Sequence, residues 1–293
     1  MNRRSLTLAL VGCPGIGGKS IARVHTRNDL LGRTPEEFLK LGEEALIEEY
    51  RIPPAAASTW VIGRKGWIQQ ANATEERLSA SGIQWVTLAD AHYPGGIEEL
   101  SPDPPGVLFL YGNERLLRIE TACVLASRDP DPQTLDMVEK LSEEHVLEGR
   151  ALVSGHDTPA YQRAAVVPLR FGAPRILVLD RGHFVVLGPQ LDQEPFAAAR
   201  LWRFAFDPRT DLVVSAVPPE RDYHRNSNRV RDKLVAGLSR QLDIVSARAS
   251  GNMEQLAKAA LRAGRPVRVH PGAKCAAPLL ALGARAIDQP FVC

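Results

Sequence analysis

Cysteine and long apolar runs are scarce in this chain of 293 residues. The four cysteines show no CxxC spacing; they are Cys13, Cys123, Cys275 and Cys293. This pattern indicates neither a zinc site nor a disulfide framework, and it favours a reducing cytoplasm. No apolar run approaches the roughly 20 residues that span a bilayer, so we expect no membrane segment.

Catalytic and cofactor motifs are missing as well. The sequence has no HExxH, no GxSxG and no GxGxxG after the first strand of its strand–helix alternation. Ser154, His156 and Asp157 are close neighbours and suggest a hydrolase, but the nucleophile elbow that would support this interpretation is absent. We therefore expect no catalytic residue, no metal and no cofactor.

The charge is nearly balanced overall and uneven locally. A net charge of +2, with 44% apolar and 24% charged residues, is typical of a soluble globular protein with a substantial core. Positions 258–274 hold five basic residues and no acid: Lys258, Arg262, Arg265, Arg268 and Lys274. The net charge alone does not indicate a polyanionic partner.

The stretch LTLALVGCPGIGGKS, residues 6–20, admits three interpretations. A P-loop requires a glycine five residues before Gly18, where this chain has Cys13, so an NTPase is disfavoured. A lipoprotein signal would use the apolar run at 6–12, which is at the short end for such signals. Cleavage before Cys13 would also remove the first helix of the motif that follows.

We favour the third interpretation, a helix-hairpin-helix. Pro14 ends one helix, Gly15 and Gly17 permit a tight turn, Ile16 fills the hairpin, and Lys19 opens a second helix. Because a helix N-terminus offers N–H groups to an anion, Gly15, Gly17 and Lys19 are candidate phosphate contacts. A plain turn between two helices fits the same residues.

Residues 1–81 are predicted to form a small helical domain. Thr34, Pro35 and Glu37 make a capping box at the start of a helix over residues 34–50. A further helix is predicted over 71–80, ending at Ser81–Gly82.

Residues 82–293 are predicted to form an α/β domain with a doubly wound, mostly parallel, Rossmann-like sheet. After strands at 84–88 and 107–111, short apolar strands alternate with helices, which indicates a sheet covered on both faces. Ligands of such sheets collect at the carboxyl ends of the strands. Those ends are Ser127–Arg128, Ser154–Asp157, Asp180–Gly182 and Ser250–Asn252.

The order of motifs resembles the DNA-processing protein A (DprA/Smf) family over nearly the whole chain. Residues 82–117 contain GIQWVTLADAHYP and SPDPPGVLFLYGN, close to the family's segment ahead of its Rossmann domain. VLASR at 124–128 resembles the family's VGSR, LVSG at 152–155 its second strand, and RDKLVAGLS at 231–239 its RNRIIAGLS.

The resemblance implies a divergent member of that family without its C-terminal winged helix. Such a protein would bind single-stranded DNA in recombination or DNA uptake, protect the strand or load a RecA-type recombinase, and form a homodimer without catalysing a reaction. Ala126 replaces the glycine of VGSR, Asp232 and Lys233 replace the second and third residues of RNR, and Ser246 replaces an acid. The loop after Gly155 is shorter than the family's.

The side chains at the predicted strand ends and the resemblance to the DprA/Smf family together predict a nucleic-acid site. Its candidate residues are Ser127, Arg128, Ser154, Gly155, Arg163, Arg225, Arg229, Arg231, Lys233, Ser250, Gly251 and Asn252. Arg128 and Arg231 are the leading candidates for phosphate contacts, although each arginine also fits a surface charge or a structural ion pair. Tyr161, Tyr223 and Phe184 are candidates for base stacking.

A different class of function stays open. The chain is also compatible with a nucleotide-binding sensor or a phosphoribohydrolase-like enzyme of the wider Rossmann superfamily. The phosphoribohydrolase motif PGGxGT is missing, which counts against the enzyme.

Overall fold

The computed structural model describes residues 1–287, so Cys293 lies outside the described part. The described chain forms two compact units. The first unit comprises Met1–Tyr93 and Pro102–Leu110, and the second comprises Pro94–Ser101 and the chain from Tyr111 onward. These units group residues that contact one another in the folded chain, and they do not test where one domain ends and the next begins. The domain boundary after residue 81 therefore stays a prediction.

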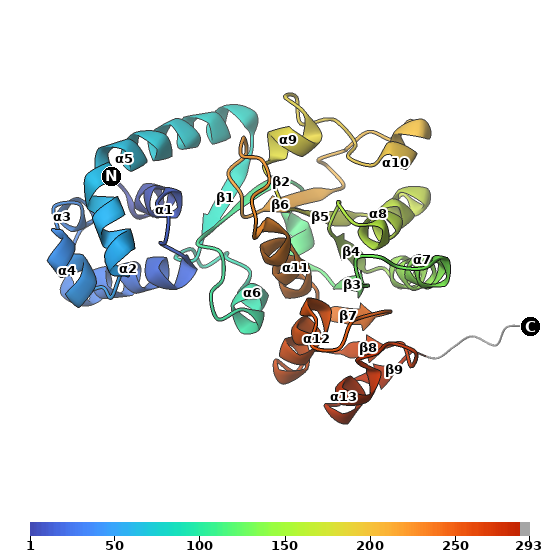
Figure 1. Ribbon diagram of the computed structural model, residues 1–293. Coiled ribbons are helices and arrows are strands. Elements are labelled where there is room, and N and C mark those ends of the chain that lie inside the picture. The colour runs from blue at the N-terminus through green and yellow to red at the C-terminus, as the bar shows by residue number, and fades with distance from the viewer. Residues whose placement is uncertain (288–293) are drawn as a thin grey trace, which may run out of the picture. The chain divides into compact units, whose positions relative to one another are not determined.

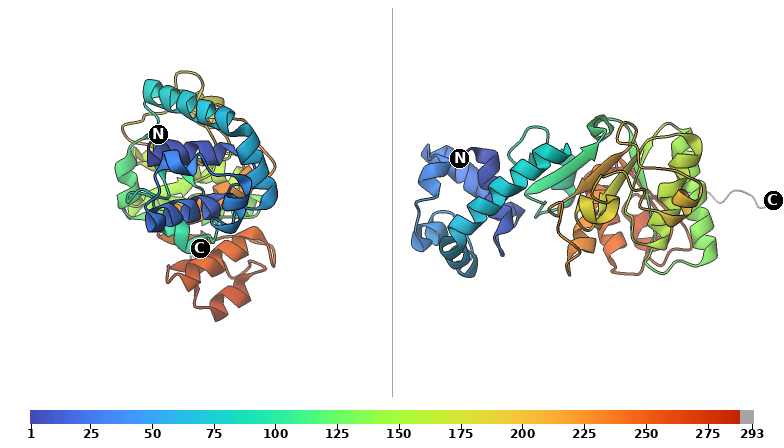
Figure 2. Two further views of the ribbon diagram at one scale, coloured as in Figure 1. Left: turned by 90° about the vertical axis from the view of Figure 1, so that its left-hand side faces the viewer. Right: turned by 90° about the horizontal axis from the view of Figure 1, so that it is seen from above.

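The first unit is mainly helical (Figure 1). Its elements are α1 Arg3–Gly12, α2 Gly18–Leu31, α3 Pro35–Phe38, α4 Glu43–Glu48, α5 Pro54–Ser81, β1 Gln84–Thr87 and the first part of β2 Val107–Gly112. The long helix α5 packs against α1 and α4, as the views in Figure 2 show. Strand β1 pairs with β2 in antiparallel register, Gln84 opposite Leu110 and Thr87 opposite Val107.

Helices α1 and α2 flank the turn that the sequence singled out. Ile16, Ile21 and Val24 are buried, and Gly15 has φ +84°, a left-handed conformation that glycine adopts without strain. The predicted turn between two helices is therefore present. Its role as a nucleic-acid-binding hairpin stays a prediction.

Two helix predictions in this unit were wrong in extent. The capping box of Thr34 and Glu37 is present, but the predicted helix over 34–50 is broken into α3 and α4 around Gly42, the residue that precedes α4. The helix predicted over 71–80 begins much earlier, at Pro54. A proline in the first turn favours that start, and Gly82 ends the helix with φ +70°.

The second unit alternates strands with helices from Thr121 onward. Its short elements before that point are α6 Gly95–Leu100 and the 3₁₀ helix Glu114–Arg118. The strands are β3 Thr121–Leu125, β4 Ala151–Ser154, β5 Arg175–Leu179, β6 Leu212–Ser215, β7 Gln241–Ile244, β8 Val267–Val269 and β9 Arg285–Ala286. The helices are α7 Pro132–Leu147, α8 Pro159–Phe171, α9 His183–Leu187, α10 Ala197–Leu201, α11 Ser227–Leu238, α12 Asn252–Arg262 and α13 Ala276–Ala281.

These strands form a parallel sheet in the order β6-β5-β4-β3-β7-β8-β9. The chain moves outward in one direction from β3 to β6 and returns to the other side of β3 with β7. The boundary between β3 and β7 is thus a topological switch point, where open α/β sheets bind ligands at the strands' carboxyl ends. The predicted doubly wound, mostly parallel fold is confirmed.

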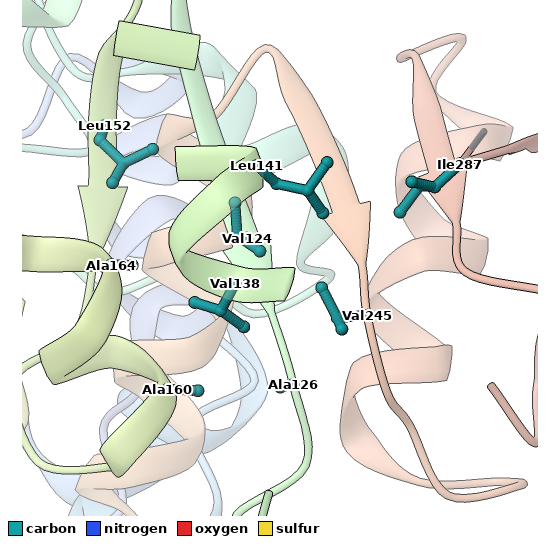
Figure 3. Packing of buried hydrophobic residues seen from close by; sticks show 9 residues of the cluster. All are labelled: Val124, Ala126, Val138, Leu141, Leu152, Ala160, Ala164, Val245 and Ile287. Carbon is teal, nitrogen blue, oxygen red and sulfur yellow. The ribbon is translucent and has the colours of Figure 1, made fainter. Parts of the chain in front are cut away.

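Helices cover both faces of this sheet. Helices α7 and α8 pack on β3 and β4, while α11 and α12 pack on β3 and β7. Figure 3 shows Val138 and Leu141 of α7 against Val124 of β3, with Leu152 and Val245 in the same buried cluster. This packing fixes the strand ends from which the candidate site is built.

Among residues 1–287, no helix has both the length and the hydropathy required to cross a membrane.

Candidate nucleic-acid interface

A cavity of about 450 Å³ opens at the switch point of the sheet, and we call it the switch cavity. It is lined by Ala126, Ser127, Arg128, Asp129, Thr158, Asn228, Arg229, Arg231, Asp232, Arg248, Gly251, Asn252 and Met253. Half of the predicted site residues meet here: Ser127, Arg128, Arg229, Arg231, Gly251 and Asn252. The segments after β3 and β7 and the starts of α11 and α12 supply most of this wall.

The N-terminus of α12 reaches the switch cavity without a side-chain cap. Gly251 precedes the helix and has no side chain to accept from the first turn, and Gly251, Asn252 and Met253 all line the cavity. By contrast, Asp131 caps α7 and Thr158 caps α8 through their side-chain oxygens. Uncapped first-turn N–H groups and the helix dipole favour an anion at this position.

Two arginines add positive charge to the same cavity. Arg128 and Arg229 are exposed, and neither forms an ion pair within residues 1–287. Arg248 lies 3.5 Å from Asp129 in an exposed pair, which solvent screens. Guanidinium groups without a carboxylate partner are suited to contact phosphates.

Arg231 is placed differently from Arg128. Its side chain is only 2% exposed, and its guanidinium pairs with Asp157 and with Asp232, whose Oδ1 accepts from Nε at 2.8 Å. Burial lowers the pKa of Arg231 from its usual value, and the Asp232 charge opposes that shift. The phosphate contact of Arg231 stays a prediction, but this chain already supplies its anionic partners.

Asp232 connects the elements that surround Arg231. Its Oδ1 also accepts from the Tyr161 hydroxyl at 3.0 Å, and its Oδ2 accepts from Asn252 Nδ2 at 2.8 Å. The Arg231 guanidinium lies 4.7 Å from the Tyr161 ring centroid, and burial raises the pKa of the Tyr161 phenol well above its usual value. Tyr161 is therefore buried against Arg231, so a base would have to displace that contact to stack on it.

The remaining predicted residues do not line the switch cavity. A Cβ on Gly155 would lie 2.7 Å from the Tyr161 ring and 2.9 Å from Arg231, so this glycine permits close packing. Arg163 pairs with Glu139 on the outer surface, and the Ser250 N–H donates to Glu254. Arg225, Lys233 and Ser154 do not line the switch cavity either.

The hydrolase suggested by Ser154, His156 and Asp157 lacks its hydrogen bonds. Within residues 1–287 the buried Ser154 hydroxyl has no partner, Asp157 pairs with Arg231, and His156 Nε2 lies 3.7 Å from Asp180. Burial lowers the pKa of His156 to about 4, so the ring is neutral at pH 7. These three groups form no Ser-His-Asp relay.

A second cavity of about 610 Å³, the Tyr223 cavity, shares Arg128, Asp129, Thr158 and Asn228 with the switch cavity. Tyr223 is 44% exposed there, with the Arg181 guanidinium 5.7 Å from its ring centroid. Of the three aromatic residues predicted to stack on bases, Tyr223 lines a cavity at the strand ends, while Phe184 and Tyr161 do not.

The hairpin candidates Gly15, Gly17 and Lys19 lie in the first unit, where the start of α2 is occupied. The Lys19 N–H donates to the Asp103 carboxylate at 2.8 Å, and a Cβ on Gly17 would lie 3.2 Å from the same group. The Asp103 carboxylate thus holds the position that an anion would take at this helix N-terminus. The predicted phosphate contact stays a prediction and would require Asp103 to be displaced.

Seven residues that line the switch cavity were not among the predicted site residues: Ala126, Asp129, Thr158, Asn228, Asp232, Arg248 and Met253. Arg248 lies between the end of β7 and the predicted strand-end segment Ser250–Asn252, so starting that segment directly after the strand would have included it. Across the described part of the chain, no group of three or more histidine, cysteine, aspartate or glutamate residues is arranged to hold a metal.

Comparisons with known proteins agree with this architecture. The sequence profile of the family described as DNA recombination-mediator protein A matches residues 84–287. No curated protein gave a significant sequence match.

Two solved structures resemble this chain in fold. DNA processing protein A (DprA) from Streptococcus pneumoniae matches with a TM-score of 0.69 and 21% identity, covering 98% of this chain and 94% of that one. DNA processing protein A from Helicobacter pylori, from a study of its single-stranded DNA binding mode, matches with a TM-score of 0.54 and 21% identity over 71% of this chain and 93% of its own.

The profile covers well over half of the chain, including the strands on both sides of the switch point and the helices that reach the switch cavity. The chain belongs to the DNA recombination-mediator protein A (DprA) family, and its role is in DNA processing and recombination.

Proposed function

We propose that this protein binds single-stranded DNA through the switch cavity and acts by binding, without catalysing a reaction. The observation that carries the proposal is the meeting of an uncapped helix N-terminus with Arg128 and Arg229 at the sheet's switch point. The Helicobacter pylori relative, whose study names single-stranded DNA, supports the choice of ligand.

The arrangement of charge favours a polymer backbone over an isolated base. The phosphate of a strand lies against the first turn of α12, with Arg128 and Arg229 contacting that phosphate and its neighbour. Arg231 orients the site, because its ion pair with Asp157 holds α11 against the β4–α8 loop, while Asp232 accepts from Asn252 at the start of α12. Tyr223 offers an exposed ring for a base in the adjoining cavity.

A binding panel tests the ligand class. We expect fluorescently labelled oligothymidylate to bind with an affinity that falls with salt, by about 0.7 logarithmic units per tenfold salt for each phosphate contacted. Duplex DNA, single-stranded RNA and mononucleotides serve as competitors, and a nucleotide-hydrolysis assay runs beside them. Stabilisation by a mononucleotide without any binding to oligothymidylate would contradict the proposal and favour a nucleotide sensor; nucleotide hydrolysis would contradict its non-catalytic part.

Three finer parts of the function are proposals that rest on family membership. We propose that the bound strand passes to a RecA-type recombinase, that the protein forms a homodimer, and that it works in the cytoplasm. Light scattering tests the dimer, and a strict monomer at the concentrations used for DNA binding would contradict it.

A further inference from the structure

A third cavity continues from the switch cavity on the other side of β7. This Lys274 cavity has a volume of about 770 Å³ and lies at the ends of β7 and β8 beside the start of α7. It shares Ser127, Asp129 and Arg248 with the switch cavity. A chain-like ligand that leaves the switch cavity past Arg248 therefore enters the Lys274 cavity directly.

The wall of this cavity combines apolar side chains with charged ones of both signs. Met137 and the buried Val245 and Ala273 supply apolar contact surface, while Arg248 and Lys274 are exposed cations. The volume lies within the range of roughly 300–1,000 Å³ typical of small-ligand pockets. An apolar surface beside cations suits a nucleotide, whose base is flat and whose phosphate is charged.

The acids of the cavity already have partners. Asp131 caps α7 by accepting from the Thr134 N–H at 2.7 Å, and Asp129 is paired with Arg248. Lys274 forms no ion pair within residues 1–287. Its ammonium group is thus available to an external anion.

The basic stretch at 258–274 supports the same conclusion, because most of its charges have structural partners. Lys258 pairs with Glu254, Arg265 donates to the carbonyl oxygens of Ala236 and Ser239, and Arg268 pairs with Asp243. Arg262 and Lys274 remain exposed, and of the two only Lys274 lines the cavity.

We propose that the Lys274 cavity is a second nucleotide subsite of the single-stranded DNA path. A base of the strand packs on Met137, Val245 and Ala273, and Lys274 contacts the adjoining phosphate. This inference rests on the proposed function, because the strand must first occupy the switch cavity.

Oligothymidylates of increasing length, bound to wild type and to single variants, test the subsite. Lys274→Ala should leave the affinity for the shortest binding oligomers unchanged, weaken longer ones about five- to tenfold, and reduce their salt slope by about 0.7. Lys274→Glu should have a larger effect in the same direction. Arg262→Ala is the matched control, since it removes the same charge from the same basic stretch outside the cavity, and it should change binding by less than twofold.

Equal losses for Lys274→Ala and Arg262→Ala, or no length-dependent loss for Lys274→Ala, would overturn the subsite. Either result, with salt-sensitive binding that still depends on Arg128, would leave the proposed function intact. Absence of binding to every oligomer would instead overturn the proposed function. Thermal unfolding of each variant checks the fold, which should not change because Lys274 is exposed.

Discussion

The helix N-termini of α2 and α12 look alike in sequence and differ in the folded chain. Each follows a glycine, Gly17 or Gly251, that makes no side-chain cap hydrogen bond. At α2 the Asp103 carboxylate accepts from the Lys19 N–H, whereas at α12 the first turn lines the switch cavity. A carboxylate of the chain lies near each helix start, but in different places: at α2 the Asp103 carboxylate accepts from an N–H of the first turn, while at α12 the Glu254 carboxylate accepts from the Ser250 N–H ahead of the helix. The first-turn N–H groups of α12 therefore stay open to an external anion.

The arginines of the second unit divide in the same way. Arg231 is buried between Asp157 and Asp232, while Arg128 and Arg229 are exposed and unpaired within residues 1–287. The phosphate contact of Arg231 stays a prediction from the sequence, and its ion pairs with Asp157 and Asp232 support the positioning role proposed above. Groups with internal partners should therefore control stability, and groups without them should control binding.

Removal of the Arg231 guanidinium should give the largest effect on stability. Arg231→Ala leaves the buried carboxylate of Asp232, and that of Asp157, without a counterion, which typically costs about 3–5 kcal/mol. Urea unfolding measures the loss of unfolding free energy. The double variant Arg231→Ala/Asp232→Asn should be more stable than Arg231→Ala alone, because one uncompensated charge is gone.

If Arg231→Ala were as stable as wild type and still lost DNA binding, Arg231 would contact phosphate directly and the division between the two sets of arginines would be wrong.

Removal of the Asp103 carboxylate should have a smaller effect, in the first unit. Asp103→Ala leaves the start of α2 without its acceptor and should cost about 1 kcal/mol, as for other helix caps. Asp103→Asn keeps an acceptor oxygen and should lose less. Sulfate should stabilise Asp103→Ala more than wild type, because the vacated N-terminus can then bind an anion.

Equal stabilisation of Asp103→Ala and wild type by sulfate would show that Asp103 does not occupy an anion position.

The sequence was sufficient to predict the sheet because its signal is local. Short apolar strands such as Arg175–Leu179 alternate with amphipathic helices such as Asn252–Arg262, and this pattern alone indicates parallel strands with helices on both faces. The strand-end rule then placed Ser127, Arg128 and Gly251 at one edge, where the structure brings them together.

What the sequence did not predict depends on contacts between distant residues. Asp103 lies 84 residues after Lys19, and Asp157 lies far from Arg231 along the chain, so neither pairing leaves a pattern in a single sequence. The extent of α5 was underestimated because Gly63 and Gly66 weaken its local helix propensity, which tertiary packing on α1 overrides.

The most direct test compares two double variants that remove the same charge. Arg128→Ala/Arg229→Ala removes both unpaired arginines from the switch cavity, and Arg118→Ala/Arg262→Ala removes two exposed arginines outside the cavities. By anisotropy with labelled oligothymidylate, the first should bind about 100-fold more weakly, roughly 2.7 kcal/mol, with a salt slope reduced by about 1.4. The second should stay within about threefold of wild type; equal losses in both, or wild-type binding by the first, would contradict the switch cavity as the DNA site.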